Sequence, residues 1–192
     1  MRKPDNYDIS AAILPGEFEN LEPGGYVCQI VKVEEKNSQK GRPMVVFYFD
    51  IFEGEHRGIY RTRYDSNMGA EKKWPNSGTY RQPVDGESTK FFKGIIEKSI
   101  EPSNRGFKFD WDEKKLMGKL FGGVFGREEY FSMTQGKRMF STKLMSWMTV
   151  EDIRSGKFQI PDDKLLNGFE EPPPLGFLDD SVYMTPEKDL PF

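Results

Sequence analysis

Basic and aromatic side chains interleave at four places in this chain, and single-stranded nucleic acid is bound by that combination of groups. A ring stacks on a base, a contact worth about 1–3 kcal/mol, while Lys and Arg neutralise the phosphates. Tyr64, Trp74 and Tyr80 lie among polar, Pro and Gly residues and are the stacking candidates, and Arg61 and Arg63 are candidates for phosphate contacts. The four places predict a nucleic-acid-binding set of Tyr60, Arg61, Arg63, Tyr64, Lys72, Lys73, Trp74, Tyr80, Arg81, Lys137 and Arg138.

Most aromatic side chains in any folded domain serve packing rather than binding. Two positions in the most hydrophobic β-like run, Phe47 and Phe49, alternate with Tyr48 and Asp50, so one of the two sets faces the core. We expect the following residues to be core: Phe47, Phe49, Phe91, Phe92 and Ile95.

Catalytic groups are sparse. The chain has one histidine, His56, in a Gly-flanked turn, and one cysteine, Cys28, which excludes an intramolecular disulfide and a Cys-based zinc cluster. No phosphate-binding Gly-rich loop is found, and the acid pairs are sequential neighbours. The sequence predicts no enzyme, no cofactor and no metal site, although carboxylates from separate elements could still converge as in a metal-dependent nuclease.

The last four residues, Asp189, Leu190, Pro191 and Phe192, place a free carboxylate on a large apolar side chain after a proline. A partner needs only an apolar pocket and a cation to capture such an end. The four residues are therefore predicted to dock a partner, and an ordinary frayed terminus is the alternative.

Charge divides the chain into three segments. Residues 1–24 carry a net charge of −3, residues 25–169 carry +5 and residues 170–192 carry −5, so the pI of about 5.4 conceals a basic body. We predict an N-terminal extension over 1–24, one nucleic-acid-binding domain over 25–169, and a disordered, Pro-rich acidic tail over 170–192. No secretory signal or membrane-length apolar run appears, which predicts a cytoplasmic protein without membrane contact.

Hydrophobic periodicity predicts the elements that must position these groups. Residues 59–64 are expected to be a strand with Tyr60, Thr62 and Tyr64 on one side and Arg61 and Arg63 on the other. Residues 65–86 are expected to be loop, and Pro102 should end the main helix. The expected order is strands over 25–35, 42–53 and 59–64, a helix over 88–100, a helical turn over 111–118, strands over 120–131 and 138–148, and a helix over 150–155.

Three strands, a helix-containing connection and two further strands is the order of an OB-fold, a small five-stranded, partly open barrel that binds oligonucleotides or oligosaccharides. The predicted fold class is therefore mainly β with minor α: an OB-fold barrel with an elaborated connection between its third and fourth strands. An α+β roll is the competing architecture.

Body and tail together resemble the single-stranded DNA-binding protein family, whose bacterial members join an OB domain through a flexible linker to an acidic tip ending Asp-Asp-Asp-Ile-Pro-Phe. Asp189, Pro191 and Phe192 match that tip, Leu190 replaces Ile, and Lys188 interrupts the acidic run. The opening of the body, from Leu21 to Cys28 and from Lys40 to Met44, is similar in style to small single-strand-binding proteins of phages.

The resemblance implies a phage or prophage protein that coats single-stranded DNA without strong sequence preference. Its tip would recruit replication, recombination or repair proteins of host or phage. A non-nucleic-acid adaptor that docks through Phe192 is the alternative, and a metal-dependent nuclease is the third. The pattern does not distinguish DNA from RNA, or a monomer from a homo-oligomer.

Overall fold

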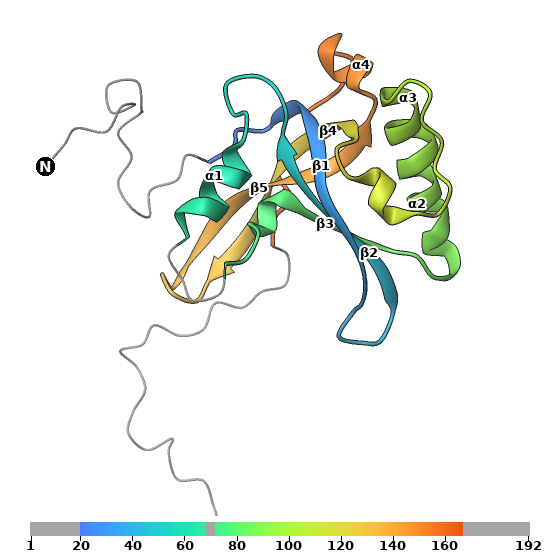
Figure 1. Ribbon diagram of the computed structural model, residues 1–192. Helices are drawn as coiled ribbons and strands as arrows, with labels where there is room; N and C mark the ends of the chain where they lie inside the picture. The colour runs from blue at the N-terminus through green and yellow to red at the C-terminus, as the bar shows by residue number, and fades with distance from the viewer. Residues whose placement is uncertain (1–19, 68–71, 167–192) are drawn as a thin grey trace, which may run out of the picture.

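A computed structural model describes residues 20–67 and 72–166. The chain is mainly β, with five antiparallel strands in the order β3-β2-β1-β4-β5 and short helices around them (Figure 1). The strands are β1 Gly24–Asn37, β2 Pro43–Ile51, β3 Thr79–Pro83, β4 Leu120–Ser132 and β5 Lys137–Met148. The helices are α1 Ile59–Ser66, α2 Thr89–Ile95, a π turn Ile96–Ile100, α3 Glu101–Ser103 and α4 Val150–Arg154, with 3₁₀ turns Asn76–Gly78, Gly86–Ser88 and Glu113–Leu116.

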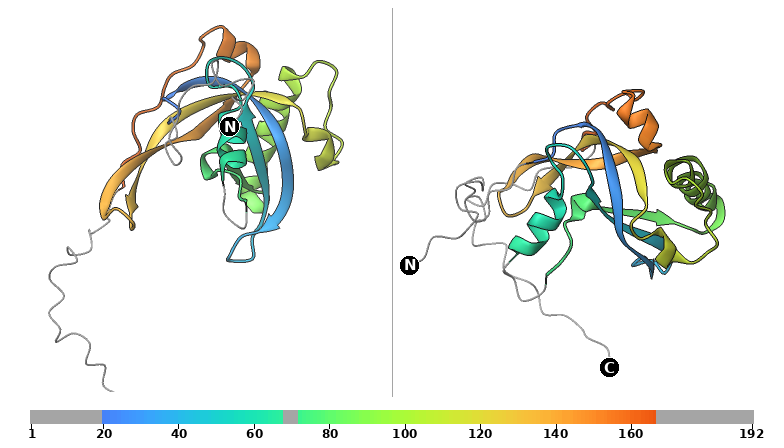
Figure 2. Two further views of the ribbon diagram at one scale, coloured as in Figure 1. Left: turned by 60° about the vertical axis from the view of Figure 1, so that its left-hand side comes forward. Right: turned by 45° about the horizontal axis from the view of Figure 1, so that its top comes forward.

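Most of the predicted elements are confirmed, including the mainly β class, four of the five strands and the short helix after β5. The predicted main helix is present as α2, the π turn and α3, and it ends at Ser103 rather than at Pro102. The described strands form an open sheet whose edges, β3 and β5, do not pair with each other. Figure 2 shows the β1–β2 and β4–β5 hairpins diverging from the middle of this sheet.

The predicted strand over 59–64 is wrong, because these residues form helix α1. The cause is a carboxylate ten residues upstream. Asp50, on β2, accepts hydrogen bonds from the backbone N–H groups of Tyr60 and Arg61, each at 2.9 Å, and so satisfies donors that a helix start leaves unpaired. The alternation within residues 59–64 does not reveal a hydrogen bond to Asp50, so it predicted a strand where a helix forms.

The third strand of the meander is Thr79–Pro83, inside the segment predicted to be loop. It pairs with β2 from Tyr48 opposite Thr79 to Met44 opposite Pro83. A five-residue edge strand that ends in proline carries little sequence signal, since proline is tolerated only at such edges.

A bulge at Val31 decides which side chains of β1 reach solvent. The pairing with β2 shifts between Ile30 and Lys32, so one residue is inserted into β1. Before the bulge the even-numbered Cys28 and Ile30 face the core, and after it the odd-numbered Val33 does. Because a one-residue shift exchanges the faces of a strand, Lys32 and the even-numbered residues after it point outward together.

The core lies between the inward face of the sheet and the helix that begins with α2. Phe47, Phe49, Phe92 and Ile95 are buried as predicted. Phe91 is not: its side chain is 60% exposed, because the helix turns it away from the sheet. The largest fully buried side chains are Tyr60, Phe47, Phe49, Phe121 and Phe125.

One ring bridges the two edges of the sheet. Trp147 on β5 stacks on Phe121 of β4 with ring centroids 4.1 Å apart. The same indole contacts Tyr80 of β3 edge-on at 5.4 Å and Phe47 of β2 at 5.2 Å. Side chains, rather than backbone hydrogen bonds, therefore connect β5 with the β2–β3 side.

None of the helices in the described residues has the length and apolar character needed to cross a lipid bilayer.

Replacing Tyr60 by phenylalanine tests its place in the core. Its hydroxyl is buried without a hydrogen-bond partner among the described residues, and burial raises its pKa. Removing an unsatisfied polar group relieves its desolvation cost, so Tyr60→Phe should leave the free energy of unfolding unchanged or raise it by about 1 kcal/mol. Urea unfolding monitored by circular dichroism measures this, and a loss above about 1 kcal/mol would contradict the assignment.

Candidate functional site

A groove of about 760 Å³ lies on the outward face of β1, β2 and β3. Helix α1 and the segment before β3 form its wall, so the groove joins residues from separate parts of the chain. Its lining is Val31, Lys32, Glu34, Lys36, Tyr48, Arg61, Tyr64, Lys72, Lys73, Trp74, Asn76, Thr79 and Arg81.

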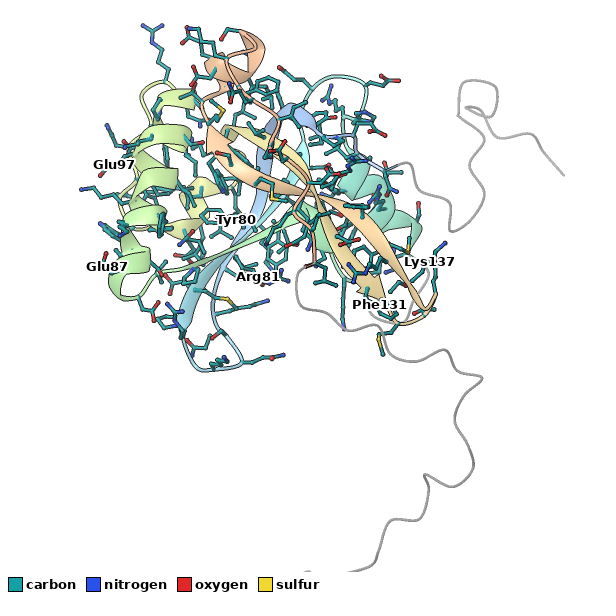
Figure 3. All side chains as sticks on the ribbon, turned by 180° about the vertical axis from the view of Figure 1, so that it is seen from behind. Tyr80, Arg81, Glu87, Glu97, Phe131 and Lys137 are labelled. Atoms are coloured by element: carbon teal, nitrogen blue, oxygen red, sulfur yellow. The ribbon has the colours of Figure 1, made fainter. Side chains whose placement is uncertain are left out.

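Six of the residues predicted from the sequence line this groove: Arg61, Tyr64, Lys72, Lys73, Trp74 and Arg81. Five do not. Tyr60 is fully buried, Tyr80 packs against Trp147, and Arg63 is half-buried with its guanidinium 6.0 Å from the Tyr60 ring. Lys137 and Arg138 begin β5 at the tip of the β4–β5 hairpin, away from Arg81, as Figure 3 shows for Lys137.

The helical form of α1 explains this sorting. On a strand, Arg61 and Arg63 would share one side, but on a helix residues three apart share a face. Arg61 therefore groups with Tyr64, and both reach the groove. Tyr60 groups with Arg63 on the inner side, where burial lowers the pKa of the guanidinium. Because residues 59–66 form a helix and not a strand, Arg61 and Tyr64 reach the groove whereas Tyr60 and Arg63 do not.

Four side chains on this wall follow one another in contact as cation, ring, ring and cation: Arg61, Trp74, Tyr64 and Lys72. We call these four residues the Trp74 stack. The Arg61 guanidinium lies 5.7 Å from the Trp74 ring, the two ring centroids are 5.5 Å apart, and the Lys72 ammonium lies 5.9 Å from the Tyr64 ring. The indole N–H of Trp74 donates to the carbonyls of Phe49 and Gly78. These bonds fix the stack to the sheet.

One ring of the groove, Tyr48, was missed by sequence reasoning. Tyr48 points outward from β2, directly opposite Lys32 on β1 and Thr79 on β3. Ammonium groups of Lys32 and Lys36 lie 5.9 and 5.7 Å from its ring. The alternation of Tyr48 with Phe47 and Phe49 was a usable signal for its outward orientation, whereas the bulge that turns Lys32 outward was not visible.

Glu34 organises the cations around Tyr48. Its carboxylate accepts a hydrogen bond from the Tyr48 hydroxyl at 2.8 Å and forms ion pairs with Lys32 and, at 2.6 Å, with Lys36. The two ammonium groups and the hydroxyl lower the pKa of Glu34 from 4.5 to about 2. The group is therefore ionised, and can only accept hydrogen bonds, across the physiological range.

The groove is strongly basic. Among its described lining residues, six are Lys or Arg and one, Glu34, is acidic. Lys32, Arg61, Lys72 and Arg81 are exposed, so their charges face solvent. An open, basic concavity with three rings, from Tyr48, Tyr64 and Trp74, can hold a polyanion that also carries flat groups.

The tip of the β4–β5 hairpin is a separate basic and aromatic surface. Arg138 lies 3.3 Å from Glu129, and Tyr130 and Phe140 are exposed on the ribbon. Residues 163–166 run along the β4 edge, where Arg127 forms a bidentate ion pair with Asp163. Glu129 and Asp163 thus partly offset the positive charge of this hairpin.

Groups suited to catalysis are not gathered in the described residues, which contain no cluster of three or more His, Cys, Asp or Glu placed to hold a metal ion. Cys28 is buried, and burial raises the pKa of its thiol. The predicted docking residues Asp189, Leu190, Pro191 and Phe192 lie outside the described residues.

Residues 5–83 match the model of a family described as a protein of unknown function, DUF669. The matched segment ends with β3 and includes every lining residue of the groove. No curated protein matches the chain.

Removing the carboxylate of Asp50 should loosen the α1 wall of the groove. Besides Tyr60 and Arg61, the N–H of Ile51 donates to it at 2.9 Å. Asp50→Ala leaves three amides without their acceptor and should lower the free energy of unfolding by about 3 kcal/mol. Asp50→Asn keeps the oxygen that accepts two of the three bonds and should cost less. Urea unfolding of both variants measures the difference, and equal losses would show that the hydrogen bonds do not hold the helix.

The ion pairs of Glu34 should stabilise the fold in a pH-dependent way. Because folding lowers the pKa of Glu34 from 4.5 to about 2, its contribution is present above pH 4.5 and is lost as the pH falls toward 2. The stability difference between the natural chain and Glu34→Gln should therefore be largest near neutrality and shrink in acid. Urea unfolding at a series of pH values tests this, and a difference that is constant with pH would contradict it.

Proposed function

We propose that this protein binds single-stranded DNA without strong sequence preference, using the groove on β1, β2 and β3. The observation that carries the proposal is the convergence of six cationic side chains and three rings on one open surface. They come from five separate parts of the chain, namely β1, β2, α1, the segment before β3 and β3 itself. Phosphates would contact the cations, and unpaired bases would stack on the rings.

The geometry favours a single strand over a duplex for a physical reason. The rings of Tyr48, Tyr64 and Trp74 can stack only on bases that are not already stacked within a double helix. A duplex would be limited to contacts between its phosphates and the Lys and Arg side chains. Such contacts are nonspecific and weaken with salt.

The arrangement of the strands supports an OB-fold barrel as the finer description of the fold. In a closed five-stranded barrel of this type the sheet order β3-β2-β1-β4-β5 would be completed by contact between β3 and β5, with a helix inserted between β3 and β4. Helix α2 occupies that position in the chain, and Trp147 reaches from β5 to Tyr80 on β3. The groove then corresponds to the outward strand face that binds ligands in this fold.

The remaining parts of the proposal concern partners and origin. The C-terminal residues Asp189 to Phe192 would recruit replication, recombination or repair proteins, with the ring of Phe192 in an apolar pocket and its carboxylate on a cation. A phage or prophage origin and a cytoplasmic location belong to the same proposal, and the origin is supported by the similarity in style of the opening of the body to single-strand-binding proteins of phages.

Binding should be measured by the fluorescence anisotropy of labelled oligo-dT, titrated with protein at several salt concentrations. Arg61→Ala removes one phosphate contact and half of the Arg61–Trp74 pair, so it should weaken binding at every salt concentration. The slope of log K against log salt should fall by about 1. Labelled duplex of the same length should bind more weakly than the single strand.

Arg154→Ala is the matched control. Arg154 is an exposed arginine on α4 that pairs with Glu53 and does not line the groove, so its removal should leave the affinity unchanged. If the natural chain shows no binding at low salt, or equal affinity for duplex, the proposed function is wrong. Capture of a protein partner that requires Phe192 in that case would favour the adaptor, and Mg²⁺-dependent cleavage of the strand would favour the nuclease.

A further inference from the structure

The charges of the groove are not spread evenly across its width. Strand pairing sets that width, because Lys32 on β1, Tyr48 on β2 and Thr79 on β3 lie directly opposite one another. Two inter-strand spacings, about 10 Å, therefore separate the β1 side of the groove from the β3 side. In the next row of outward residues Glu34 lies on β1 and Arg81 on β3. The only carboxylate among the described lining residues is thus on the β1 side.

Glu34 neutralises most of the charge on the β1 side. Its carboxylate forms ion pairs with the ammonium groups of Lys32 and, at 2.6 Å, of Lys36. It also accepts a hydrogen bond from the Tyr48 hydroxyl at 2.8 Å, which fixes that ring from its edge. Two cations and one anion leave a net charge of +1 here. A phosphate drawn to either lysine would also approach the ionised Glu34, so this side suits neutral bases better than phosphates.

The opposite side carries positive charge without a lining carboxylate. We call its four cations the cationic wall: Arg61 on α1, Lys72 and Lys73 before β3, and Arg81 on β3. Arg61 and Lys72 lie against the rings of the Trp74 stack, and Arg81 donates to the side-chain oxygen of Asn76 at 2.9 Å. These partners are neutral, and within the described residues Arg61, Lys72 and Arg81 form no ion pair. Their charges therefore remain available to an anion.

We infer that the phosphates of a bound single strand follow the cationic wall, and that its bases point across β2 toward β1, stacked on Tyr48. The inference rests on the proposed function and adds to it the course of the strand. Salt dependence then comes mainly from one side of the groove, because counterions are released where phosphates meet cations that are not already neutralised. Lys36, which donates to the Tyr48 hydroxyl at 3.1 Å, instead helps to position the ring.

The test compares two lysine variants that remove the same charge from the same groove, Lys72→Gln and Lys32→Gln. Both side chains are exposed and line the groove, so uniform attraction to a basic surface predicts equal effects. Binding of labelled oligo-dT of about 12 nucleotides, within the range of site sizes for small barrels, is measured from about 50 to about 200 mM salt.

Lys72→Gln should lower the slope of log K against log salt by about 1, so its affinity deficit should shrink about fourfold over this range. Lys32→Gln should leave the slope unchanged. Arg81→Gln is a second variant of the cationic wall and should behave as Lys72→Gln does. Equal losses of slope in the two lysine variants, or a loss in Lys32→Gln alone, would overturn the inference.

Glu34→Gln tests the neutralised side directly. Without the carboxylate, Lys32 and Lys36 become available to phosphates, so the slope for oligo-dT should steepen by about 1. A slope that stays as in the natural chain would show that Glu34 does not keep phosphates from the β1 side.

A strand of abasic units tests the base side, since it keeps every phosphate and lacks every base. Tyr48→Ala should weaken the binding of oligo-dT about tenfold without changing the slope, and should leave binding of the abasic strand as it is. Lys72→Gln should lower the slope for both strands. Equal weakening of both strands by Tyr48→Ala would contradict the stacking of bases on this ring.

Circular dichroism checks the fold of each variant, and the natural chain decides the proposed function separately. If the natural chain binds oligo-dT but the slopes of the lysine variants fall equally, only the course of the strand is wrong. If the natural chain fails to bind at low salt, the proposed function itself is removed.

Discussion

The groove depends first on a single inserted residue in β1. Without the bulge at Val31, Lys32, Glu34 and Lys36 would continue the inward series of Cys28 and Ile30, and three charged groups would face the core. Burying them would cost several kcal/mol each, so the strand could not pair with β2 in that register. The bulge removes this conflict, and it also twists the hairpin. The bulge therefore allows β1 to bury its apolar first half and to expose its charged second half within the same sheet.

A second constraint links the sheet to the wall of the groove. The Asp50 carboxylate is buried, and burial raises its pKa although three backbone amides donate to it. Those bonds start α1, and α1 in turn carries Arg61 and Tyr64 to Trp74. The indole N–H returns to the carbonyl of Phe49, the residue before Asp50. The site is thus fixed at both ends to one short stretch of β2, so its geometry should be as stable as that central strand.

The sequence predicted the strands with strong composition, the main helix and the division between core and surface for residues such as Phe47, Phe49 and Tyr64. It also predicted that basic and aromatic residues converge, and six of the eleven proposed positions do. What it could not predict were contacts made across the chain. The Asp50 cap turned an alternating segment into a helix and moved Tyr60 and Arg63 out of the site, and pairing with β2 made a strand of Thr79–Pro83. The bulge added Lys32, Glu34 and Lys36.

The contacts of Trp147 have a mechanical consequence. Two strands paired by N–H···O=C hydrogen bonds cannot separate by even an ångström without breaking those bonds, because the bonds are directional and short. Rings in edge-on and stacked contact slide over one another at little cost, since dispersion and area burial are not directional. The β3 and β5 edges, joined by Trp147, Tyr80 and Phe121, are therefore held by contacts that tolerate small displacements, whereas the four ladders of the sheet are held by directional hydrogen bonds. This tolerant contact lies beside β3, which forms one side of the groove.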